Sequence, residues 1–141
     1  MRVNDDFEKW NAAHQINDEN SVHAFWKRAL VFRKQHDVLV RFKNFVALNN
    51  INTCPQTYGD FEDISLGDER VFAFVRCLGS TKALVVLNFK EEDVEFTLDA
   101  GRDWSGYTLR LGSYGDDAGD GDVESGKVLL QGYEGRVYVT L

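Results

Sequence analysis

From residue 58 onward the sequence is a series of short apolar or alternating runs, separated at regular intervals by turn residues. Ala83–Phe89 (ALVVLNF) is the most apolar run, which predicts the centre of a sheet. Several short strands with evenly spaced turns are typical of an antiparallel β-sandwich or a small barrel. The expected strands are 58–64, 70–78, 83–89, 94–98, 107–111, 128–130 and 136–141.

Three of these runs carry more detailed expectations. Val94, Phe96 and Leu98 alternate with polar residues, as in a strand with one face buried. Arg70–Leu78 is nearly all apolar, which predicts a strand that is buried on both faces. In the last run Val137, Val139 and Leu141 fall on one face of the strand because strand side chains alternate.

Ahead of the strands, Ser21–His36 is predicted to form one amphipathic helix. Its apolar residues recur at the i, i+3, i+4 spacing of a single helical face, and Ser21 is a suitable N-cap. A helix with two aromatic side chains on that face needs a large apolar partner. If the face stays uncovered, we expect the chain to self-associate through it. The face consists of Val22, Phe25, Trp26, Ala29 and Leu30.

The segment Arg41–Thr57 fits neither the helix nor the strands. It contains no acidic residue, it holds the one proline, and it separates the runs 38–40 and 58–64, which read as strand-like and would join smoothly without it. Segments that fold together usually agree with their surroundings, so this one needs an explanation. It is either a long functional loop or a short intron read through in frame. On either view it should not pair into the sheet, and its deletion should leave the fold intact.

Composition excludes several classes of protein. A chain of 141 residues forms about one domain. The formal charge of -7, with Asp+Glu 23 against Lys+Arg 16, disfavours nucleic acid as a partner. There is no apolar run that could span a bilayer and no signal-like start, so we expect a cytoplasmic protein with no membrane contact. Cys54 and Cys77 lack any repeated spacing, which favours two reduced thiols over a disulfide or a zinc site.

The acidic and aromatic residues are the candidates for a functional site. The acidic loop 116–124 fails the ligand spacing of a calcium-binding loop, since Ala118 or Ser125 falls where a ligand or the turn glycine is required. The other carboxylates lie in turns or at exposed strand positions, which is typical of surface charge. An aromatic group could stack on sugars, although packing in a core or interface is the alternative. That group is Trp104, Tyr107, Tyr114, Tyr133 and Tyr138.

Longer stretches of the chain resemble a known family. They are 1–40, YGDFEDIS, DERVFAFVRCLGSTKALVVLNF and LQGYEGRVYVTL, in that order. Together they are similar to the C-terminal part of α-glucosidases from the maltase and oligo-1,6-glucosidase branch of the α-amylase family, glycoside hydrolase family 13. The segment 41–57 departs from the family pattern, and Met1 falls where family members continue from preceding residues.

The resemblance implies a domain organisation. Residues 1–40 would be the end of a (β/α)8 barrel with its last helix, 41–57 an insertion or loop, and 58–141 the all-β C-terminal domain that packs on the barrel. The family's catalytic carboxylates lie on earlier barrel strands whose motifs have no counterpart here. We therefore expect no catalytic, substrate-binding or metal-binding residue in this chain, and no cofactor.

The expected fold is mainly β: one N-terminal amphipathic helix followed by an antiparallel β-sandwich. The expected role is structural, as the C-terminal domain of an α-glucosidase-like hydrolase, with the barrel as its partner. Two alternatives remain open. One is a free-standing carbohydrate-binding β-sandwich, and the other is an independent hydrolase with two convergent carboxylates.

Overall fold

The computed structural model describes residues 5–9, 11–40, 60–65, 67–115 and 123–140. They form two compact units, 1–35 and 36–141. The helices are α1 Ala12–Ile16, α2 Val22–Gln35, α3 Asp37–Val40 and the 3-10 turn η2 Val123–Ser125. The strands are β1 Asp60–Asp63, β2 Val71–Leu78, β3 Thr81–Asn88, β4 Val94–Thr97, β5 Tyr107–Gly112, β6 Lys127–Leu130 and β7 Gly135–Thr140.

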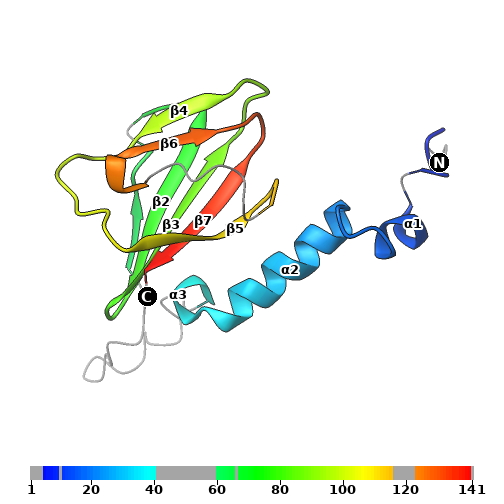
Figure 1. Ribbon diagram of the computed structural model, residues 1–141, viewed down its shortest axis with the longest axis horizontal. Helices are drawn as coiled ribbons and strands as arrows, with labels where there is room; N and C mark the ends of the chain where they lie inside the picture. Colours follow the sequence, from blue (N-terminus) through cyan, green and yellow to red (C-terminus); the bar gives the residue numbers. More distant parts are fainter. Residues whose placement is uncertain (1–4, 10, 41–59, 66, 116–122, 141) are drawn as a thin grey trace, which may run out of the picture. The chain divides into compact units, whose positions relative to one another are not determined.

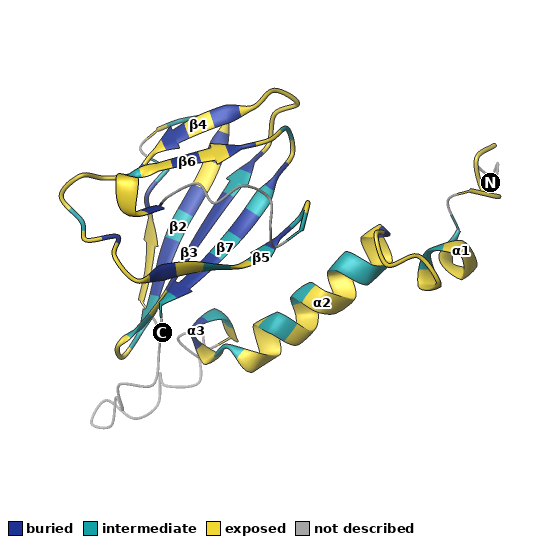
Figure 2. Ribbon diagram, in the orientation of Figure 1, coloured by how far each residue is buried: buried dark blue, intermediate teal, exposed yellow. Residues whose placement is uncertain are grey.

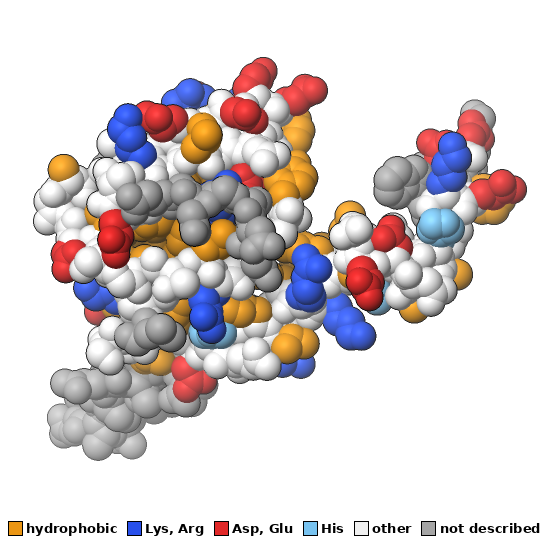
Figure 3. All heavy atoms as spheres, viewed as in Figure 1, with side chains coloured by type: hydrophobic (Ala, Val, Ile, Leu, Met, Phe, Trp, Pro, Cys, Tyr) orange, Lys and Arg blue, Asp and Glu red, His pale blue; other side chains and the backbone are white. Residues whose placement is uncertain are grey.

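The first unit consists of α1 and α2. The predicted helix is confirmed almost to the residue, and Ser21 caps it: its hydroxyl oxygen accepts from the Ala24 backbone N–H at 3.1 Å. No residue of α2 is buried, and Trp26 is 59% exposed. Much of this helical unit is coloured as exposed in Figure 2, and apolar side chains are visible between its charged ones in Figure 3. None of the helices in the described ranges is long and apolar enough to cross a membrane.

The second unit is a two-sheet antiparallel structure (Figure 1). A five-stranded sheet has the order β1-β2-β3-β7-β5, and β4 pairs with β6 in a second, smaller sheet. β3 lies at the middle of the larger sheet, as its apolar sequence predicted. The mainly β fold with a helix ahead of an antiparallel sandwich is therefore confirmed.

The hydrophobic core is formed by the inner faces of both sheets. Val94 and Phe96 of β4 are buried while Glu95 and Thr97 are exposed, so the predicted alternation is confirmed. From the larger sheet, Leu84 and other inner residues of β2, β3, β5 and β7 complete the core (Figure 2). The buried cluster also includes Ile64, Leu98, Trp104 and Val123 from the connecting segments.

The strand-like interpretation of 38–40 was wrong, because Asp37–Val40 forms the short helix α3. α3 packs on the outer face of β2 and β3, with Val38 only 2% exposed. The Arg76 guanidinium reaches α3 and donates from Nη1 to the Leu39 carbonyl oxygen at 3.1 Å. These tertiary contacts outweigh the strand preference of a Val-Leu-Val run, which is a weak local preference.

The expectation that β2 is buried on both faces was also wrong. Val71, Ala73 and Val75 point into the core, but Phe72 on the opposite face is 36% exposed and Phe74 is only partly buried. The apolar side chains of β2 therefore lie on two faces of the strand. One face is buried in the core, and the other is partly exposed to solvent.

Candidate functional site

The acidic residues do not form a metal centre in the described part of the chain. Among those residues, no group of three or more His, Cys, Asp or Glu side chains could hold a metal ion. Most of the acidic loop, 116–122, lies outside the described residues. Glu124 lies in η2, and its carboxylate accepts from the Gly106 backbone N–H at 3.3 Å. This contact ties η2 to the start of β5.

The aromatic residues do not form a common platform, because most of them belong to the core. Trp104, Tyr107 and Tyr138 are between 2% and 8% exposed, while Tyr114 and Tyr133 are exposed. The indole N–H of Trp104 donates to the Asp99 carbonyl oxygen at 2.8 Å, and its ring packs on Tyr107. Burial raises the pKa of Tyr107 to about 12, so its hydroxyl stays neutral and does not act as a base.

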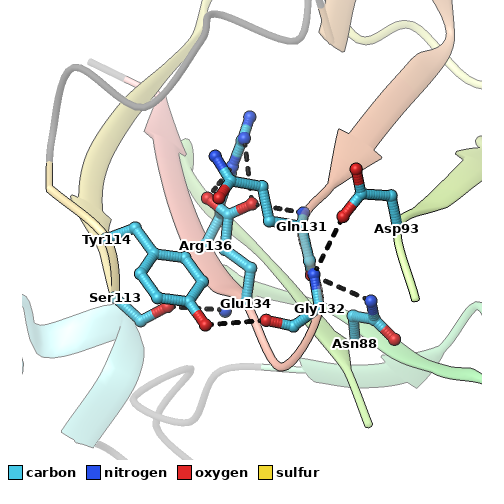
Figure 4. A network of polar contacts seen from close by, with 9 residues as sticks. Asn88, Asp93, Ser113, Tyr114, Gln131, Gly132, Glu134 and Arg136 are labelled. Atoms are coloured by element: carbon cyan, nitrogen blue, oxygen red, sulfur yellow. Dashed lines mark hydrogen bonds and ion pairs between the residues drawn. The ribbon is translucent and has the colours of Figure 1, made fainter. Parts of the chain in front are cut away.

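The most developed polar cluster is a buried ion pair at the start of β7. Glu134 is 0% exposed and Arg136 is 3% exposed. The carboxylate accepts from Arg136 Nε at 2.7 Å, from Arg136 Nη2 at 3.1 Å and from the Gln131 backbone N–H at 2.7 Å (Figure 4). Burial lowers the pKa of Arg136, but the hydrogen bonds that Arg136 donates to Glu134, with a further contribution from Tyr138, raise this pKa above its usual value. The hydrogen bonds of this pair fix the chain between β6 and β7.

Neighbouring residues extend this cluster (Figure 4). The buried Asn88 side chain donates to the carbonyl oxygens of Glu92 at 2.8 Å and Gln131 at 2.9 Å. The Tyr114 hydroxyl donates to the Gly132 carbonyl oxygen at 2.7 Å. Three turns and β7 are thereby joined through one set of hydrogen bonds. The arrangement is structural, because these groups are occupied by one another rather than directed at a ligand.

Sequence reasoning did not identify Glu134 as a buried acid, since it placed all carboxylates on the surface. A signal was present in the sequence. Glu134 and Arg136 are two residues apart, and residues at that spacing on a strand lie on the same face. The core-facing side of β7 is therefore Arg136 and Tyr138, opposite the face that carries Val137 and Val139.

The second feature is a set of apolar side chains on the outer face of the five-stranded sheet. The strand register places Phe74 opposite Val85, Val85 opposite Val137 and Val137 opposite Leu111. The next row pairs Phe72 with Leu87. We call this surface the outer apolar face; it consists of Phe61, Phe72, Phe74, Leu87, Leu111 and Val137, all of them exposed or half-buried.

The rings of the outer apolar face pack on one another. Phe74 lies 5.2 Å from Phe61 and 5.4 Å from Phe72, measured between ring centroids, with interplanar angles of 36° and 44°. A contiguous exposed apolar surface on a small domain usually marks a site of contact with another protein segment. The described residues thus offer a contact surface rather than a catalytic constellation.

Comparison with known proteins assigns the fold to a family. Residues 61–141 match the family described as "Alpha amylase, C-terminal all-beta domain". The chain is 35% identical over 116 residues, 82% of its length, to an alpha-glucosidase of Schizosaccharomyces pombe. It is 31% identical over 131 residues, 92% of its length, to the oligo-1,6-glucosidase IMA5 of Saccharomyces cerevisiae.

Solved structures show the same architecture. Isomaltulose synthase (PalI) from Klebsiella sp. LX3 matches 99% of this chain with a TM-score of 0.75 at 25% identity. Trehalulose synthase MutB from Pseudomonas mesoacidophila MX-45 matches with a TM-score of 0.74 at 23% identity, which shows the fold alone. The chain spans 17% of the S. pombe alpha-glucosidase, 18% of IMA5 and 21% of each of the two synthases.

Proposed function

Because this chain belongs to the family of alpha-amylase C-terminal all-beta domains, we propose that it acts as the structural C-terminal domain of an α-glucosidase-type glycoside hydrolase. The observation that carries this proposal is the match of the whole sandwich, 61–141, to that family. Two relatives are named as glucosidases, and the matched region makes up only 17% and 18% of their lengths. The catalytic barrel would then lie outside these 141 residues.

In this proposal, residues 1–40 correspond to the end of the barrel with its last helix, 41–57 to an inserted segment, and 58–141 to the C-terminal domain. The exposed apolar face of α2 supports the first part, because such a face is expected to pack against a larger apolar body. The complete protein would release glucose from maltose- or isomaltose-type substrates in the cytoplasm. The chain by itself would contribute stability and no catalysis.

The experiment uses the alpha-glucosidase of S. pombe from which the region matching this chain has been removed. We expect this truncated enzyme to be poorly stable, and we expect the 141-residue chain added in trans to raise its maltose hydrolysis and its resistance to heat. An unrelated acidic β-sandwich protein is the control. The chain alone should show no turnover of maltose, isomaltose or an aryl α-glucoside. Turnover that survives repurification, or the absence of any effect in trans, would contradict the proposal.

A carbohydrate-binding role is the second candidate, since the exposed rings of Phe61 and Phe72 and the half-buried ring of Phe74 lie on one sheet face. Their mutual tilt of 36° and 44° differs from a flat platform, and the aligned positions of β3 and β7 carry only Val, Leu and Gly. Sugar recognition also requires polar donors and acceptors beside the rings. Calorimetric titration with maltose and isomaltose tests this role, and millimolar or tighter binding would favour it.

A further inference from the structure

We draw no further inference here: the strongest candidate, the patch of exposed aromatic side chains formed by Phe89, Tyr114 and Tyr133 around the turn between β6 and β7, carries nothing, because no observation in the structure shows what covers it.

Discussion

Replacement of Arg136 by Met should strongly destabilise this domain, because it leaves the Glu134 carboxylate buried without its cation. Glu134 is 0% exposed and accepts three hydrogen bonds, two of them from Arg136. Removing one partner of a buried pair usually costs about 3–5 kcal/mol, since the remaining charge has neither water nor a counter-ion. Domains of this size are stable by roughly 5–15 kcal/mol, so the loss is a large fraction of the total.

The assay is urea unfolding followed by tryptophan fluorescence, which reports on the buried Trp104. The double variant Glu134→Leu/Arg136→Met is the informative control, because it removes both charges and leaves neither unpaired. We expect its loss of unfolding free energy to be smaller than the sum of the losses in Glu134→Leu and Arg136→Met. The difference between that sum and the loss of the double variant is the coupling free energy of the two side chains.

This account of the pair would be refuted if Arg136→Met lost less than about 1 kcal/mol of unfolding free energy. It would also be refuted if the losses of the two single variants added up to the loss of the double variant.

Three further predictions follow from other parts of the structure. Gly132→Ala should destabilise the domain by about 1–3 kcal/mol in urea unfolding, because its new Cβ would overlap the Glu91 carbonyl oxygen. Hydrogen bonds from Arg70 lower the pKa of Asp68 to about 2, so Asp68→Asn should be less stable than the wild type at pH 7, with the difference fading between about pH 4 and pH 2 in acid-unfolding scans. The wild-type chain should bind a hydrophobic dye and self-associate, and Trp26→Lys should reduce both in fluorescence and sedimentation measurements; an unchanged dye signal would contradict the role of the α2 face.

The elements predicted correctly are those that depend on neighbouring residues in the sequence. The cap at Ser21, the alternation of β4 and the central position of β3 all follow from local periodicity or composition. The helix α3 was not predicted in this way, because its contacts are with β2 and β3, including a hydrogen bond from Arg76, and these strands lie far along the chain. Residues 41–57 lie outside the described residues, so the choice between a loop and a retained intron stays a prediction that transcript sequencing can test.

The candidate surfaces were harder to predict than the fold for a related reason. An apolar strand such as β2 has the same sequence pattern whether its second face enters a core or contacts another domain. Only the register with β3 and β7, together with the exposure of Phe72, distinguishes the two cases. The Glu134–Arg136 pair likewise depends on a turn that brings Gln131 and Asn88 beside it.

The strand β1 has a consequence for association between copies of this chain. β1 is an edge strand of the larger sheet, so the backbone N–H and C=O groups on its outer side have no neighbouring strand within the described sheet. Exposed edge strands are common sites of strand-to-strand aggregation. Three of the four residues of β1 are acidic, namely Asp60, Glu62 and Asp63, and all four are exposed. Two copies that approach with their β1 edges facing each other would bring these carboxylates into mutual repulsion, so this protein should not assemble by pairing β1 with β1.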